Sequence, residues 1–187
     1  NENLKNFFKK KEKIILEKKK RYPFYSIADI KFRLVRSDFI KEKKFFEQIM
    51  FNLMKEKNFK AEDKYSTLFM NKDDIILLDK LGHKVGLHSH THPIKIEKLS
   101  YEDQLKEYTE NINILSKTIK RPIDYIKTAS HPCGSYNDNS LNILKKLGIK
   151  LAFKDSMLIE KEKKMKKINN SNLEIARIDP FDIKNKN

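Results

Sequence analysis

The chain has a single cysteine, Cys133, among its 187 residues. One cysteine excludes an internal disulfide and fits a reducing compartment, so we expect a cytoplasmic protein. No apolar run approaches the roughly 18 to 20 residues that a membrane span needs. The first residues show no secretory signal pattern either. These absences argue against a disulfide-stabilised protein and against a protein that spans a membrane.

Arginine is also scarce, although the formal net charge is +15 and 41 residues are Lys or Arg. The arginines are Arg21, Arg33, Arg36, Arg121 and Arg177. Proteins that read nucleic acids rely on arginine for bidentate contacts to bases and phosphates. Lysine, asparagine and isoleucine are abundant together, as an AT-rich genome would produce without any functional meaning. The charge permits non-specific attraction to polyanions, but we expect no specific nucleic-acid partner.

Apolar residues recur with helical and strand-like periods along the chain. The helical pattern covers about 4–20, 26–35, 38–57, 72–81, 101–119 and 139–147, and the strand-like pattern covers 85–88, 123–128, 149–153 and 173–178. Helix and strand alternate from 72 to 178, which predicts parallel βα units and the α/β class. We assign 1–70 to a helical segment of the same domain, 71–180 to the βα units, and 181–187 to a loose tail.

Residues that cap helices precede three of these segments. Ser26, Asn71 and Ser100 each stand where a side-chain oxygen can accept hydrogen bonds from the first turn. Asp73 and Asp74 lie in the first turn of their helix, where the helix dipole favours negative charge. We therefore assign these two acids to helix stabilisation and not to chemistry.

Four of the five histidines lie in one stretch, which runs from Gly82 to Pro93 and reads Gly-His-Lys-Val-Gly-Leu-His-Ser-His-Thr-His-Pro, and the last three of them alternate with small hydroxyl residues. Val85 and Leu87 alternate with small and polar residues, as in a short strand, and Pro93 cannot continue a ladder of hydrogen bonds. His88 therefore lies at the end of a strand, where the chain enters a loop.

His88 and His92 are four residues apart, so their side chains can converge on one point. Two imidazoles at one point suggest a metal ion. The alternative is a solvated, histidine-rich surface loop. A catalytic zinc site usually has three protein ligands and one open position, so a third ligand has to come from elsewhere in the protein.

The segment at 81–93 resembles the metal-binding motif of the polysaccharide deacetylase family, also called carbohydrate esterase family four. In that motif a His-[Ser/Thr]-x-x-His segment follows a Gly-His-x-[Ile/Val]-Gly strand. Three more pieces follow in the family's order. They are the helix opened by Ser100–Leu105, the Ser130–Asn137 segment, which is similar to the proline-glycine substrate loop, and closing strands at 147–153 and 175–179. The resemblance covers roughly residues 70–180.

The resemblance implies a distorted (β/α) barrel that removes N- or O-acetyl groups from a sugar or polysaccharide. It implies that His88 and His92 bind a divalent metal, with zinc as the first expectation and cobalt or nickel as alternatives. The metal would lower the pKa of its water toward ~7 and polarise the acetyl carbonyl. A backbone N–H near Cys133 would steady the oxyanion. The residues expected to contact substrate or the oxyanion are Pro132, Cys133, Gly134, Tyr136 and Arg177.

The chain departs from the family at its first motif, a strand that carries paired aspartates as general base and third metal ligand. Asp29, Asp38, Asp73 and Asp74 do not lie on such a strand. We therefore expect a barrel that is incomplete at its N-terminus, with the first βα units upstream of Asn1 or supplied by a complementary segment or chain. The alternative is a catalytically inactive remnant that binds carbohydrate or a partner chain.

The general acid is also unassigned by the family pattern. Members that use a late histidine have it near the last strand, and no histidine follows His131 here. His131 and His90 are the candidates for this role by proximity. Ser130 stands where many members have the arginine that orients the catalytic aspartate.

Overall fold

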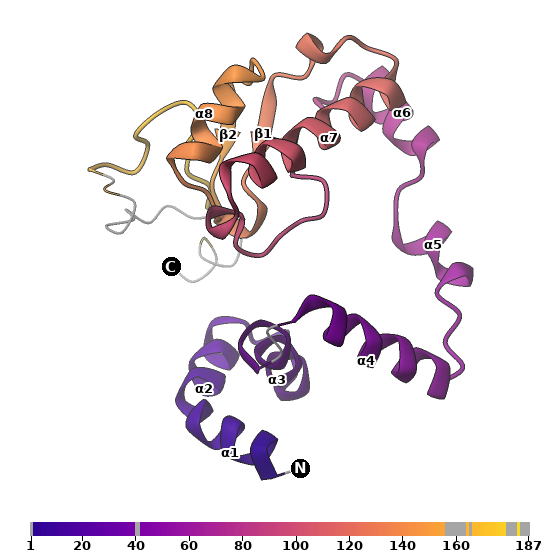
Figure 1. The fold of residues 1–187 in the computed structure, drawn as a ribbon, viewed down its shortest axis with the longest axis vertical. Helices are drawn as coiled ribbons and strands as arrows, with labels where there is room; N and C mark the ends of the chain where they lie inside the picture. The colour runs from indigo at the N-terminus through magenta and orange to yellow at the C-terminus, as the bar shows by residue number, and fades with distance from the viewer. Residues whose placement is uncertain (1, 40–41, 156–163, 165, 179–182, 184–187) are drawn as a thin grey trace. The chain divides into compact units, whose positions relative to one another are not determined.

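The computed structural model describes residues 2–39, 42–155, 164, 166–178 and 183. It divides into two units, Asn1–Leu68 and Phe69–Asn187 (Figure 1). The predicted loose tail at 181–187 lies outside the described residues, apart from Ile183. Within the described ranges, no helix is both long enough and apolar enough to cross a membrane.

The first unit is built from helices. They are α1 (Glu2–Lys10), α2 (Glu12–Arg21), α3 (Ile27–Leu34), α4 (Lys43–Glu56) and α5 (Glu62–Leu68), with a π-helical turn at Val35–Phe39. The predicted helix at 4–20 is therefore two helices that meet at Lys11. The prediction of a cap at Ser26 is confirmed, because its hydroxyl accepts a hydrogen bond from the Asp29 N–H at 3.0 Å. The Asp29 carboxylate accepts the Ser26 N–H in return, at 2.9 Å, which completes a capping box.

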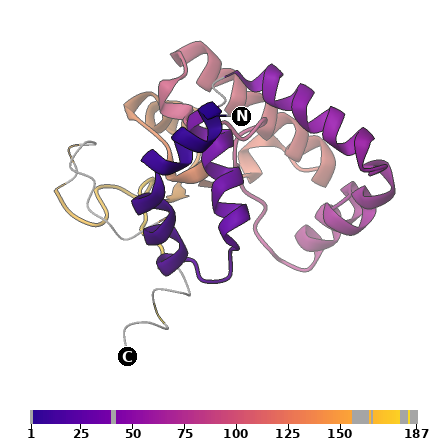
Figure 2. The same ribbon diagram turned by 90° about the horizontal axis from the view of Figure 1, so that it is seen from below.

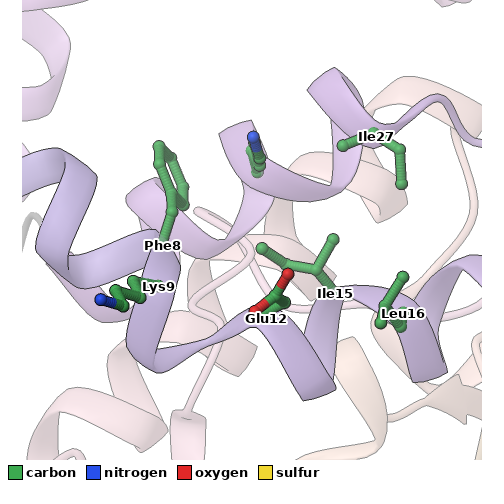
Figure 3. Close-up of a pocket in the computed structure, with 7 residues that line it drawn as sticks. Phe8, Lys9, Glu12, Ile15, Leu16 and Ile27 are labelled. Atoms are coloured by element: carbon green, nitrogen blue, oxygen red, sulfur yellow. The ribbon is translucent and has the colours of Figure 1, made fainter.

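A small core holds the first unit together, and its buried residues are Ile15, Ile30 and Leu34. The helices α2 and α3, which carry them, pack side by side (Figure 2). A pocket of about 370 Å³ lies against these helices (Figure 3). It is lined by Phe8, Lys9, Glu12, Ile15, Leu16, Ile27 and Lys31. None of the predicted site residues lines this pocket.

The second unit contains the predicted βα units. Its elements are α6 (Lys72–Lys80), α7 (Tyr101–Ile119), β1 (Thr128–Ser130), α8 (Asp138–Lys146) and β2 (Leu151–Phe153), with 3₁₀ turns at Ile96–Lys98, Ile123–Tyr125 and Pro132–Gly134. The predicted caps are confirmed: Asn71 accepts from the N–H groups of Asp73 and Asp74, and Ser100 accepts from that of Asp103 at 3.0 Å. These caps fix where α6 and α7 begin.

Short parallel segments form the sheet of the second unit. β1 and β2 pair in parallel, with Thr128 opposite Leu151. Leu87 extends the sheet beyond β1, because it donates its N–H to the Thr128 carbonyl at 2.9 Å and accepts the Ser130 N–H at 2.8 Å. Ile175 forms a parallel bridge with Phe153 on the far side of β2. The spatial order therefore follows the chain order, which confirms the predicted parallel βα arrangement.

Three of the predicted strands are wrong in extent. Ile123–Tyr125 forms a 3₁₀ turn after Pro122, and the strand begins only at Thr128. The strands expected at 85–88 and 173–178 are each reduced to a single bridge, at Leu87 and at Ile175. The described residues thus contain a group of short parallel segments, and they do not show a closed barrel.

The core of the second unit joins this sheet to its helices. Its buried residues are Leu87, Ile96, Tyr108, Ile112, Ile119, Ile126, Ala129, Ile143, Leu144, Ile149, Ala152 and Leu173. α7 packs against both α6 and α8, and α7 and α8 lie beside the strands in Figure 1. Burial of this apolar surface is the main force that fixes the position of α7 relative to Leu87, and hence to the histidines that follow it.

Candidate metal centre

Three predicted site residues, His88, His131 and Arg177, follow the short parallel segments of the sheet, and so does Asp155, which was not predicted. His88 follows Leu87, His131 follows β1, Asp155 lies just after β2, and Arg177 lies just after Ile175. The segments are parallel, so their carboxyl ends meet at the same edge. In open α/β sheets, ligands bind outside the carboxyl ends of the strands. This topology places the histidine stretch where a ligand site is expected.

The side chains of His88 and His92 are brought together. Their ring centres are 4.9 Å apart, and the ring planes are inclined at 58°. Two imidazoles on one tetrahedral zinc, with bonds of 2.0 to 2.1 Å, would place their ring centres about 5 Å apart. The separation of the two ring centres is therefore compatible with two positions around a divalent metal.

The orientation of the His88 ring is set by the end of β1. Its Nδ1 lies 2.8 Å from the Ser130 carbonyl oxygen. A carbonyl can only accept, so Nδ1 carries a hydrogen, and in the neutral ring the lone pair is on Nε2. Metal-binding histidines are commonly held by a hydrogen bond of this kind. The main-chain N–H of His88 donates to Asn111 Oδ1 at 3.0 Å, which fixes the residue from the α7 side.

The loop between the two histidines is held by a single carboxylate of α7. Glu107 Oε2 accepts the N–H groups of His90 at 2.9 Å and Thr91 at 2.8 Å. Its Oε1 accepts the Thr91 hydroxyl at 2.6 Å. Burial raises the pKa of Glu107, but the hydrogen bonds from Thr91 and His90 outweigh it and hold the pKa below its ordinary value of 4.5. Glu107 is therefore a carboxylate at neutral pH.

The His90 side chain contacts α7. Its Nε2 lies 3.5 Å from Glu110 Oε2, one helical turn after Glu107, and its side chain is 37% exposed. Of the two histidines predicted as proton donors, this is the one on the surface.

His131 directly follows β1 and is buried. Its Nε2 lies 2.8 Å from the Leu173 carbonyl, and its ring stacks on Tyr136 at 4.2 Å. Tyr136 is buried as well, and its hydroxyl donates to Glu174 at 3.2 Å. The structure therefore buries these two predicted site residues against each other.

The predicted substrate loop forms a tight turn. Cys133 is exposed with φ of 52°, and Pro132 and Gly134 are buried. A Cβ on Gly134 would collide with the Asp155 carboxylate, which would have to turn away, and the φ of 66° at this position also favours glycine. The Gly134 N–H donates to the His131 carbonyl, and the Ser135 N–H donates to the Pro132 carbonyl. Both of these donors are used within the turn.

Arg177 is exposed and ties the last segment to β2. Its Nε donates to the Lys154 carbonyl at 2.5 Å. Asp179, which the sequence placed in the same motif, lies outside the described residues.

A third metal ligand is not found in the part of the chain that the structure describes. No group of three or more His, Cys, Asp or Glu side chains within those ranges is arranged to hold a metal ion. Asp29 is used in a helix cap, Asp38 pairs with Lys11, and Asp73 and Asp74 lie at the start of α6. The described site therefore consists of a histidine pair.

Three residues of α7 that contact the histidine loop were missed from the sequence. Glu107, Glu110 and Asn111 lie at positions i, i+3 and i+4, which share one helix face. The sequence offered one signal for these residues: in the predicted helix at 101–119, two acids and an amide recur on one helix face. The loop that they meet lies 16 to 23 residues away along the chain, and periodicity alone cannot identify such a partner.

Comparison with models of known protein families identifies one family. The family model for polysaccharide deacetylase matches residues 43–152, which include the histidine pair and α7. Among solved structures, the Streptococcus pyogenes deacetylase PplD in complex with acetate is similar at 22% sequence identity and a TM-score of 0.48. The match covers 59% of this chain and 44% of that one, so this chain spans less than half of its length. No curated protein sequence matches the chain at a significant level.

Proposed function

Because the chain belongs to the polysaccharide deacetylase family, we propose that it is a metal-dependent hydrolase that removes N- or O-acetyl groups from a sugar or polysaccharide. The observation that carries the proposal is the oriented histidine pair within the matched residues. The ring centres of His88 and His92 are 4.9 Å apart. Nδ1 of His88 makes the hydrogen bond to the Ser130 carbonyl, so Nε2 is the nitrogen of that ring proposed to bind the metal. By the same family membership, we propose that the parallel segments form part of a distorted (β/α) barrel.

The metal proposed for His88 and His92 is divalent, zinc first and otherwise cobalt or nickel. When bound, such an ion would polarise the acetyl carbonyl and lower the pKa of a water molecule for attack. The third ligand and the general base would be the family's paired aspartates, contributed by residues other than those described. The proposed substrate is an acetylated sugar or polysaccharide. The proposed partner is the segment or chain that carries the paired aspartates.

The chain's own residues would bind the sugar and protonate the leaving group. We propose His90 as the proton donor to the leaving amine or hydroxyl, because its ring is exposed and Glu110 lies beside its Nε2. His131 is the second candidate for this role, and its burial against Tyr136 suits it better to supporting the turn at Pro132–Gly134. Cys133 and Arg177, which are exposed at the sheet edge, would contact the sugar.

Metal analysis tests the first half of this proposal. The wild-type chain, a His88→Ala/His92→Ala variant and a His83→Ala variant are each loaded with zinc, cobalt or nickel and then desalted. His83 is the matched control, since it is an exposed histidine of the same stretch that lies before the strand segment. We expect more bound metal in the wild type and in His83→Ala than in the double variant. Equal metal content in all three proteins would refute the site.

Acetate release tests the second half of the proposal, the hydrolysis of acetyl groups. The wild-type chain is assayed on N-acetylated and O-acetylated sugars, with and without any coding sequence upstream of Asn1. We expect release that depends on His88 and His92. The specific observation that favours an inactive, carbohydrate-binding domain is that the described residues hold no third ligand. Sugar binding without acetate release in either form of the protein would establish that second function instead.

A further inference from the structure

We propose that Glu107 and Asn111 of α7 are positioning residues that hold His88 and His92 in their chelating arrangement. The inference rests on the proposed function of this site and assigns a role to two residues outside the histidine motif. Neither side chain contacts an imidazole ring in the hydrogen bonds of the described residues. Both act on the main chain of the loop that carries the rings.

Glu107 satisfies three donors of the loop with one carboxylate. The N–H groups of His90 and Thr91 converge on Oε2, and the Thr91 hydroxyl donates to Oε1. The acceptor is ionised, and hydrogen bonds to a charged acceptor are shorter and roughly twice as strong as neutral ones. These donors lie between the two proposed ligands, so the contact controls the path of the chain from one ring to the other.

The loop needs such support because its backbone is strained at two positions. Ser89 has φ of 62° and His92 has φ of 54°, and neither residue is glycine. Left-handed backbone at residues with a Cβ persists only where the surroundings hold it in place. One of these residues is itself a proposed ligand, so the bonds to Glu107 stabilise the same conformation that brings the His92 ring next to His88.

Asn111 lies one turn further along α7 and fixes the other proposed ligand. Its Oδ1 accepts a hydrogen bond from the His88 main-chain N–H at 3.0 Å. The Ser130 carbonyl accepts a hydrogen bond from Nδ1–H of the same residue. His88 is thus held through its main chain by α7 and through its ring by β1. The i, i+4 spacing of Glu107 and Asn111 lets one helix face anchor both ends of the chelating segment.

The test compares changes at Glu107 with a change at Glu110, which lies on the same helix but contacts only the His90 ring and Lys106 in the hydrogen bonds and ion pairs described. Glu107→Ala, Glu107→Gln and Glu110→Gln are titrated with cobalt, and visible absorption reports binding. Loss of a group that orients a metal ligand typically costs 10- to 100-fold in affinity. We expect a weakening of roughly this size for Glu107→Ala and less for Glu107→Gln, with Glu110→Gln close to wild type.

Hydrogen exchange of the metal-free protein gives a second readout. The amides of His90 and Thr91 should exchange faster in Glu107→Ala than in the wild type, while the core amides of α7 keep their protection. At Asn111, we expect Asn111→Asp, which retains the acceptor oxygen, to bind cobalt, and Asn111→Leu to bind it more weakly. Rescue by the conservative change separates positioning from general destabilisation.

The outcomes distinguish this inference from the proposed function. If the wild type and Glu107→Ala bind cobalt equally well, the positioning role is overturned and the metal site stands. If neither the wild-type chain nor a form that includes any coding sequence upstream of Asn1 binds cobalt, the proposed function fails and the positioning role fails with it. If Glu107→Ala does not fold, Glu107→Gln decides, and unchanged affinity together with unchanged exchange at Thr91 overturns the inference.

Discussion

Gly86 lies against Thr128 of β1, and replacing it with alanine should loosen the site. An ideal Cβ on Gly86 would lie 2.5 Å from Thr128 Oγ1, 2.9 Å from the Thr128 carbonyl oxygen and 3.2 Å from its carbonyl carbon. The hydroxyl can rotate away. The carbonyl cannot, because it accepts the Leu87 N–H that joins this segment to β1.

The expected cost follows from these contacts. Overpacking a filled position typically destabilises a protein by about 1–3 kcal/mol, and opening one bridge hydrogen bond adds roughly 1 kcal/mol. We therefore expect Gly86→Ala to lower the free energy of unfolding by about 2–4 kcal/mol. His88 follows the displaced Leu87, so cobalt affinity should fall as well.

Urea denaturation followed by circular dichroism measures the stability, and cobalt titration measures the site. Gly82→Ala is the matched control. Nothing lies within 4 Å of a Cβ at that position, but its φ of 88° is strained for alanine. Gly82→Ala should therefore lose about 1 kcal/mol of stability and keep its cobalt affinity. A loss below about 0.5 kcal/mol in Gly86→Ala, with cobalt affinity unchanged, would refute the reasoning.

Two further predictions concern charged groups of the second unit. Arg121 lies 3.3 Å from the buried carboxylate of Asp79, so Arg121→Met should cost about 1–3 kcal/mol in urea denaturation by leaving that acid without its charged partner. A double change with Asp79→Asn should cost less than the single change, and equal costs would contradict the pairing. The folded-state pKa of Glu107 is lowered, so its contribution to stability is complete above pH 4.5 and is lost as the pH falls through the folded pKa. The Thr91 amide shift in NMR should accordingly titrate with a midpoint below pH 4.5, and a midpoint at or above that value would count against the bonds to Glu107.

The sequence by itself determined the helices of the second unit and the parallel order of its segments. The caps at Asn71 and Ser100 and the apolar period of residues 101–119 act within one or two helical turns, so local sequence specifies them. The spacing of His88 and His92 and its likeness to a family motif identified the pair that the structure places together. The family match then confirmed the family that this likeness suggested.

Other features were decided only by the tertiary structure. Ile123–Tyr125 forms a turn, and the segment around Ile175 contributes a bridge and not a full strand, because strand length depends on the neighbour available for pairing. His131 and His90 have similar neighbours in sequence, yet one is buried against Tyr136 and the other lies exposed beside Glu110. The contacts of Glu107 and Asn111 with the histidine loop depend on how the buried face of α7 packs against the sheet, and that packing joins residues too far apart for any local pattern to pair.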